Sequence, residues 1–142
     1  SFFSQVPGTF KIYSTDIKQI EIVENLVFCP LGTDDFLTDL ITANGVICGA
    51  GFELPAEALY LNKKLLVVPY ANHFEQHCNA QALKQLGVRV LFELDKSTQE
   101  HLITWCLEEN LVEYRWANHL ELAIDRVFDA AQDIRDAIPI MD

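Results

Sequence analysis

Residues 45–80 read GVICGAGFELPAEALYLNKKLLVVPYANHFEQHCNA, and this stretch decides the fold. A short apolar strand at 46–48 leads into a Gly-Ala-Gly turn and then a helix, in which Ala56, Leu59 and Tyr60 are spaced to share one face. A second apolar strand at 65–68 ends at Pro69, and a polar loop leads into another helix. This alternation of strands and helices predicts an α/β fold built on a parallel sheet.

The turn at 49–51 is the first candidate for a binding site. Its two glycines carry no Cβ, so the backbone can approach a ligand closely. The helix behind the turn offers unpaired N–H groups and the positive end of its dipole, a combination that binds anions such as phosphate. Glu57, six residues after Gly51, can accept hydrogen bonds from two ribose hydroxyls. The alternative is a simple strand-to-helix turn followed by a solvated glutamate.

Three features follow one another in a fixed order: Gly51 with Glu57, the strand end Val67-Val68-Pro69, and the run Glu75-Gln76-His77-Cys78-Asn79-Ala80. This arrangement resembles the donor-binding half of GT-B glycosyltransferases, which use nucleotide sugars. The similarity is strongest over residues 46–91. It is closest to the branch that contains the N-acetylglucosaminyltransferase of peptidoglycan synthesis and its uncharacterised relatives. The resemblance implies a Rossmann-like parallel sheet with helices on both faces, as in a GT-B C-terminal domain.

The resemblance also implies a set of donor-site residues. The base lies near Leu31, the diphosphate at the glycine turn, the ribose on Glu57, and the sugar on Glu75 and Gln76, with His73 near the sugar or diphosphate. The full set is Leu31, Gly49, Ala50, Gly51, Phe52, Glu57, His73, Glu75 and Gln76. The expected donor is a nucleoside diphosphate sugar, linked to UDP, with no cofactor and no catalytic residue in this half.

Position 49 departs from the family pattern. Many relatives carry His or Arg two residues before the last glycine, where it can touch the diphosphate, whereas this chain has Gly49. A non-catalytic module that kept the fold and lost its ligand therefore remains an alternative. A nucleotide-sugar 2-epimerase is a second alternative within the same architecture.

Other polar and thiol groups in this stretch have less specific interpretations. His73 and His77 are four residues apart, but the order H-F-E-Q-H differs from the zinc-protease motif, and we expect no metal site. Asn79 is expected to brace the loop rather than touch the ligand. Cys48 beside the turn is a conceivable nucleophile, although packing in the core is the more common role of such a residue.

The remaining elements follow from hydrophobic periodicity and from helix start and stop signals. Further strands are expected at 10–13, 25–29 and 88–92, and residues 17–24 fit either a loop or a ragged strand. One helix is expected to begin with Asp34 or Asp35 as its N-cap, and another spans 76–86. A third starts with Ser97 as the N-cap and Glu100 completing a capping box, and a long C-terminal helix covers 117–137.

Composition narrows the function classes. The 142 residues carry a net charge of −11, which disfavours nucleic acid because phosphates would be repelled. No apolar run is long enough to cross a bilayer. The four cysteines form no C-x-x-C pair, which favours free thiols in the reducing cytoplasm.

The chain is expected to be one donor-binding domain, spanning residues 1–142, from a longer two-domain protein. It begins with Ser1 in what reads as the tail of an amphipathic helix. GT-B catalysis takes place between two domains, so we expect a missing N-terminal acceptor domain and an inactive isolated chain. Leu120, Ile124, Val127 and Phe128 are expected to pack on the sheet, while residues 138–141 face the missing domain or a second copy in a homodimer.

Overall fold

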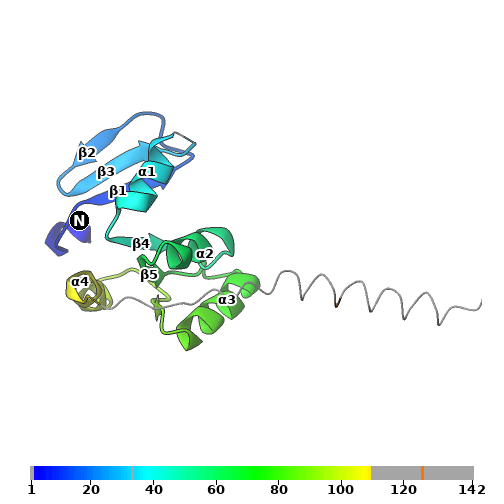
Figure 1. Cartoon of the computed structure of the whole chain (residues 1–142). Helices are drawn as coiled ribbons and strands as arrows, with labels where there is room; N and C mark the ends of the chain where they lie inside the picture. The colour runs from blue at the N-terminus through cyan, green and yellow to red at the C-terminus, as the bar shows by residue number, and fades with distance from the viewer. Residues whose placement is uncertain (1, 33, 110–125, 127–142) are drawn as a thin grey trace, which may run out of the picture.

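The computed structural model describes residues 2–32, 34–109 and 126. Its elements alternate between strand and helix over most of that length (Figure 1). In chain order they are η1 (Phe3–Gln5), β1 (Phe10–Ser14), β2 (Glu21–Val23), β3 (Leu26–Pro30), α1 (Asp35–Thr42), β4 (Gly45–Cys48), α2 (Glu53–Tyr60), β5 (Lys64–Val67), α3 (Phe74–Gln85), β6 (Arg89–Val90) and α4 (Gln99–Leu107).

The strands form two three-stranded sheets rather than the one sheet that the sequence predicts. The sheet β4-β5-β6 is parallel throughout, with helices in both crossovers. In the sheet β1-β3-β2, β1 runs parallel to β3. Residues 21–23 form the antiparallel edge strand β2, which settles the open choice between loop and strand for that region. The predicted α/β class with a parallel sheet is confirmed.

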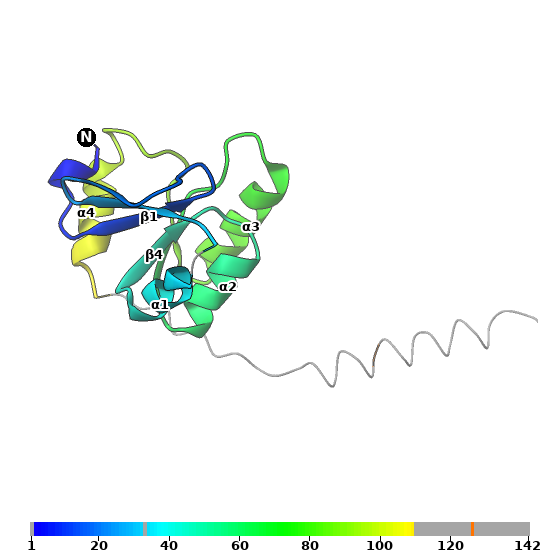
Figure 2. The same ribbon diagram turned by 90° about the horizontal axis from the view of Figure 1, so that it is seen from above.

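Side chains alternate along β5 between the two faces of the second sheet. Leu65 and Val67 join a core cluster with residues from α2 and α3, whereas Leu66 joins a second cluster with Leu102 and Trp105 of α4. Successive residues of a strand point to opposite faces, so one short apolar strand supports both layers. Figure 2 shows α2 and α3 on one side of β4 and α4 with the N-terminal segment on the other. The prediction of helices on both faces is therefore confirmed.

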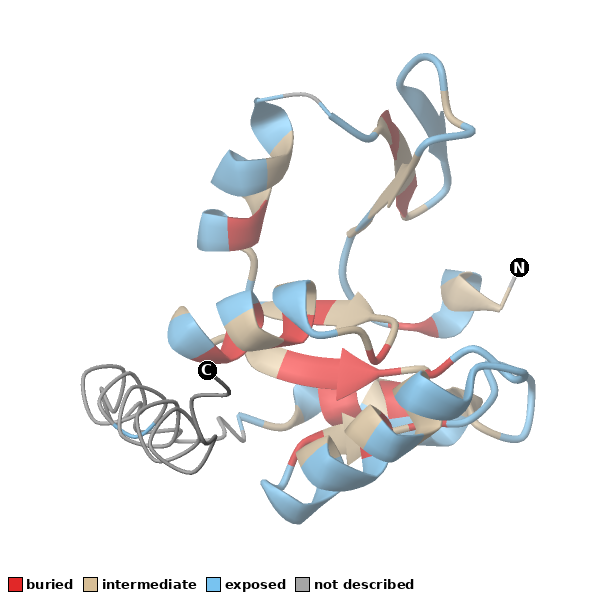
Figure 3. Cartoon of the chain, turned by 90° about the vertical axis from the view of Figure 1, so that its right-hand side faces the viewer, coloured by how far each residue is buried: buried red, intermediate tan, exposed pale blue. Residues whose placement is uncertain are grey.

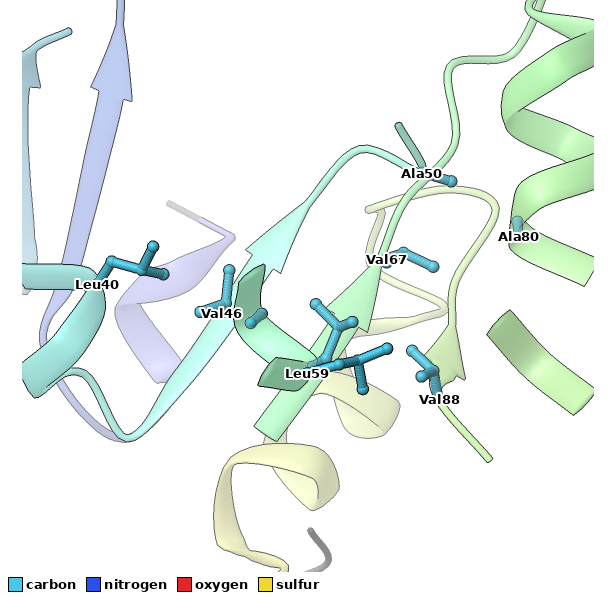
Figure 4. Packing of buried hydrophobic residues seen from close by; sticks show 9 residues of the cluster. Leu40, Val46, Ala50, Leu59, Val67, Ala80 and Val88 are labelled. Atoms are coloured by element: carbon cyan, nitrogen blue, oxygen red, sulfur yellow. The ribbon is translucent and has the colours of Figure 1, made fainter. Parts of the chain in front are cut away.

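The buried residues concentrate at the centre of this second sheet. Figure 3 shows β5 buried along most of its length, and Leu66 has no exposed surface. Side chains from β4, α2 and β5, together with Val88 just before β6, converge on the face that α2 and α3 cover (Figure 4). This packing fixes the ends of β4 and β5, from which the candidate site begins.

The buried face of α2 differs from the predicted one. Tyr60 is exposed, and the residues that pack inward are Pro55, Ala58 and Leu59. The proline lies in the first turn, where a helix does not need its missing N–H, so its ring can be buried without breaking the helix. The apolar face is thus set by the spacing 55, 58, 59 rather than 56, 59, 60.

Two predicted helix caps are also corrected. Asp34 occupies the N-cap position of α1 but makes no side-chain capping bond. At α4 the N-cap position belongs to Thr98, not Ser97. The Asp95 carboxylate accepts hydrogen bonds from the backbone N–H groups of Ser97 and Thr98, so a local aspartate turn replaces the predicted capping box. The last strand, β6, spans only Arg89–Val90 and is therefore shorter than the predicted strand at 88–92.

A polar cluster ties the first sheet to α1. Lys11 Nζ lies 2.7 Å from Asp39 Oδ1, and the Tyr13 hydroxyl donates to Asp39 Oδ2 at 2.5 Å. These two donors lower the pKa of the Asp39 carboxyl below its ordinary value. Burial, followed by the hydrogen bond to Asp39, raises the pKa of Tyr13. The cluster holds α1 against β1, and so positions the segment that follows β3.

The predicted helix at 117–137 and the proposed contact at 138–141 lie outside the described residues, apart from Arg126. Among the helices that the structure describes, none is both long enough and apolar enough to span a bilayer.

Candidate functional site

Two neighbouring strands bring most of the predicted site residues together. β4 and β5 are parallel partners, with Cys48 opposite Val67 in the register. Residues 49–52 follow β4, and residues 68–73 follow β5, so both segments leave the sheet at its carboxyl edge. In open α/β sheets this edge is where ligands bind. The site is therefore built from one strand-to-helix turn, one longer loop and the start of α3.

Side chains of α3 join the two segments. The Gln76 Oε1 atom accepts a hydrogen bond from the Tyr70 backbone N–H at 3.1 Å. One turn further along, Asn79 Nδ2 donates to the Ala50 carbonyl oxygen, also at 3.1 Å. Asn79 therefore braces the glycine turn, whereas the sequence predicts that it caps or braces the loop that leads into α3. Through these two hydrogen bonds, α3 connects the turn and the loop.

The two glycines of the turn have different surroundings. Neither has the positive φ that would require glycine. A Cβ built on Gly51 would meet nothing within 4 Å. A Cβ built on Gly49 would lie only 3.3 Å from Gln76 Oε1. Gly51 thus faces open space at the start of α2, while Gly49 is covered by a side chain from α3.

The open space beside Gly51 adjoins the N-terminus of α2, which begins at Glu53. The first N–H groups of a helix have no partner within it and carry a partial positive charge. Phe52, at the N-cap position, is 69% exposed. The local geometry can therefore bind an anion through backbone groups, against the negative charge of the chain as a whole.

The predicted carboxylates lie on the two helices that flank this space. Glu57 is exposed on α2, and Glu75 is exposed in the first turn of α3. Gln76, next to Glu75, is half-buried because its carboxamide folds back over the turn. Exposed carboxylates are free to accept hydrogen bonds from ligand hydroxyls.

His73 at the end of the loop and His77 in the first turn of α3 both hold the loop in place. His73 is the N-cap of α3, and its Nδ1 accepts from the Gln76 backbone N–H at 3.4 Å. His77 Nε2 lies 3.1 Å from the Ala71 carbonyl oxygen, and its ring stacks on Phe92 with 5.6 Å between centroids. These contacts fix the start of α3. No cluster of three or more metal-ligating side chains is present among the residues that the structure describes.

Among the described residues, no hydrogen bond connects Leu31 to the glycine turn or to α3. It follows β3 in the first sheet, where its backbone N–H donates to the Ser14 carbonyl at 3.2 Å. Its side chain is exposed, so it is available to a ligand. Its role beside the base stays a prediction.

A hollow of about 470 Å³ also lies on the first sheet, away from the glycine turn. It is lined by Asp16, Ile17, Lys18, Gln19, Glu21, Val23 and Phe28.

Cys48 belongs to the core. Its side chain packs against the cluster that includes Val46 and Val67. Burial raises the pKa of this thiol to about 12, which keeps it protonated at neutral pH. A nucleophilic cysteine needs the opposite environment, so the structure supports the packing role.

Sequence reasoning missed two features of the site. One is the role of Tyr70, a 68% exposed residue whose backbone N–H donates to the Gln76 side chain. The other is the contact between Gln76 and Gly49, since spacing along the chain gives no sign that a helix side chain returns to the preceding turn. The only available signal was the glycine at position 49 where many GT-B relatives have a larger residue.

No curated protein and no solved structure matches the chain. The model of one protein family does match it, over residues 1–106, and this range includes both sheets, the glycine turn and the start of α3. The match covers well over half of the 142 residues, and the α/β architecture agrees with the GT-B resemblance. The chain therefore belongs to glycosyl transferase family 1.

Proposed function

We propose that this chain is the donor-binding half of an enzyme that transfers a sugar from a nucleoside diphosphate sugar to an acceptor. The observation that carries the proposal is the open space beside Gly51 at the start of α2, in a turn whose other glycine, Gly49, lies against Gln76 of α3. Membership of the glycosyltransferase family supports sugar transfer in general. The UDP-linked donor, the peptidoglycan-related branch and the cytoplasmic location are the finer parts of the proposal.

Each part of the ligand is assigned to one part of the site. The diphosphate lies against the backbone at Gly51 and the first N–H groups of α2. Glu57 accepts the ribose hydroxyls, and Glu75 and Gln76 bind the sugar. Leu31 lies near the base and His73 near the sugar or diphosphate.

The chemistry in this half is orientation and charge stabilisation. Holding the sugar and diphosphate rigidly lowers the entropic part of the barrier. The N-terminus of α2 stabilises the negative charge that develops on the departing diphosphate, because its dipole is fixed before the reaction. The acceptor and the catalytic base come from a second domain in this proposal.

A non-catalytic module is the second candidate. The specific observation in its favour is the absence of a cationic side chain at position 49 in a chain of net charge −11. Direct titration with nucleoside diphosphates separates the two candidates.

Replacing Glu57 by alanine is expected to weaken nucleoside diphosphate binding by about 1.5–3 kcal/mol, the usual range for hydrogen bonds to a charged group. Binding of pyrophosphate alone should stay nearly unchanged, because pyrophosphate has no ribose. Isothermal titration calorimetry with both ligands measures the difference. Glu100→Ala is the matched control, since it removes an exposed carboxylate from the first turn of α4, on the other side of β4, and should leave both affinities unchanged. Equal losses for the two ligands in Glu57→Ala would contradict the ribose assignment.

A further inference from the structure

One Asn-Gly pair occurs in the sequence, at Asn44-Gly45, in the connection between α1 and β4. Asn44 is exposed and lies in a bend outside any helix or strand, whereas Gly45 is the first residue of β4. The backbone nitrogen of the residue after an asparagine can attack the asparagine side chain. A glycine obstructs this attack least, because it has no Cβ. Whether Asn44 is reactive therefore depends on whether the Gly45 N–H is free of a hydrogen bond.

The ladder between β4 and β5 directs the Gly45 N–H away from β5. The Cys48 carbonyl accepts from the Val68 N–H at 2.8 Å, so the polar backbone groups of Cys48 point toward β5. These groups alternate in direction along a strand, which turns those of Gly45, three residues earlier, to the opposite side. On that side β4 is the edge of its sheet. Within the part of the chain that the structure describes, no residue accepts a hydrogen bond from the Gly45 N–H.

Packing in the core requires a small residue beside Asn44. The φ of Gly45 is not positive, so its backbone conformation does not call for glycine. A Cβ at this position, however, would lie 2.9 Å from Cη2 of Trp105 and 3.2 Å from the Lys64 carbonyl oxygen. Trp105 is buried in the cluster that holds α4 against the sheet. Even alanine would therefore displace the indole ring, and the glycine that makes Asn44 reactive is fixed by the core.

We propose that Asn44 is a site of spontaneous deamidation. The Gly45 nitrogen attacks Cγ of Asn44, the new N–Cγ bond closes a succinimide ring, and the side-chain nitrogen leaves as ammonia together with the Gly45 proton. Water then opens the ring. Cleavage between the ring nitrogen and Cγ gives aspartate, whereas cleavage between the nitrogen and the main-chain carbonyl carbon gives isoaspartate.

Both products change the chain directly before β4, the strand that leads into the glycine turn. Each product adds a negative charge at position 44. Isoaspartate also adds an atom to the main chain, because the backbone then runs through the former side chain. Deamidation therefore alters the entry to a strand of the core, and this consequence does not depend on the proposed function.

The site is tested by incubating the full chain at neutral pH and physiological temperature, followed by tandem mass spectrometry, which assigns each change to a residue. Asn44 is expected to gain one mass unit over time, and isoaspartyl methyltransferase should label one of its two products. Asn62 is the internal control, because it is also exposed but is followed by Lys63 and should stay unchanged over the same period. Asn44→Gln should remove most of the methyl label.

A synthetic peptide of residues 40–49 gives the rate of the same reaction without the fold. Deamidation in the full chain should lie within about tenfold of the peptide rate, because one intact hydrogen bond to the Gly45 N–H would slow it by about that factor. A slower rate in the full chain, or equal conversion of Asn62, would overturn the proposal.

The consequence for β4 is tested separately by thermal unfolding. The isoaspartate fraction, isolated by chromatography, is expected to unfold at a lower temperature than Asn44→Asp, which carries the same charge on an unaltered main chain. Equal midpoints would mean that β4 tolerates the extra main-chain atom, and this part of the inference would then be wrong.

Discussion

Replacing Leu66 by alanine is expected to lower the free energy of unfolding by about 4 kcal/mol, within the range of about 2–5 kcal/mol for buried leucines. Leu66 has no exposed surface and lies in β5, the central strand of the second sheet. It contacts the cluster that holds α4 against the sheet, so its removal leaves a cavity between two layers. The loss therefore includes both the transfer of the side chain and the cavity.

Urea denaturation of the full chain measures this change. Leu37→Ala is the matched control, because Leu37 is a leucine that is 60% exposed in α1 and should cost less than about 1 kcal/mol. A loss below about 1 kcal/mol in Leu66→Ala would mean that β5 is not the centre of the core.

Replacing Gly51 by valine is expected to have the largest effect on ligand binding. The β-branched side chain fills the open space beside the N-terminus of α2 and keeps phosphate oxygens away from the backbone N–H groups. Losing two charge-assisted hydrogen bonds should weaken binding about 100-fold or more. Unlike the Glu57 change, this loss should be as large for pyrophosphate as for a nucleoside diphosphate.

Calorimetry with pyrophosphate and UDP tests the expectation for Gly51→Val. The thermal unfolding midpoint serves as the control, and it should stay near that of the unmodified protein because the added Cβ meets no neighbouring atom. If Gly51→Val binds both ligands as before, the diphosphate does not lie at this turn.

Much of the fold could be predicted because periodicity and turn residues agree in the central stretch. The strand at 46–48 and the glycine turn appear within a residue or two of their predicted places. The edge strand β2 was harder to predict, because all three of its residues are exposed and its sequence lacks the apolar face of a core strand. The predicted buried face of α2 was wrong because Pro55 was not counted as a core residue.

The site was predictable only as a set of positions. Glycine spacing and the family pattern point to residues 49–52 and 73–76, and the parallel pairing of β4 and β5 brings these segments to one edge. The contact of Gln76 with Gly49 and Tyr70 depends on how α3 packs against the turn, which is a tertiary property. Spacing along the chain carries no information about such a contact.

The most direct test of the account is a titration of the ¹⁵N-labelled full chain with UDP, followed by NMR of the backbone amides. The account predicts saturable shifts at millimolar or lower concentration, concentrated at residues 49–53, near Glu57 and at the start of α3. Pyrophosphate should reproduce the shifts at 49–53 without those near Glu57. No saturable shift at millimolar UDP, or shifts confined to the hollow near Asp16 and Lys18, would contradict the donor-site assignment.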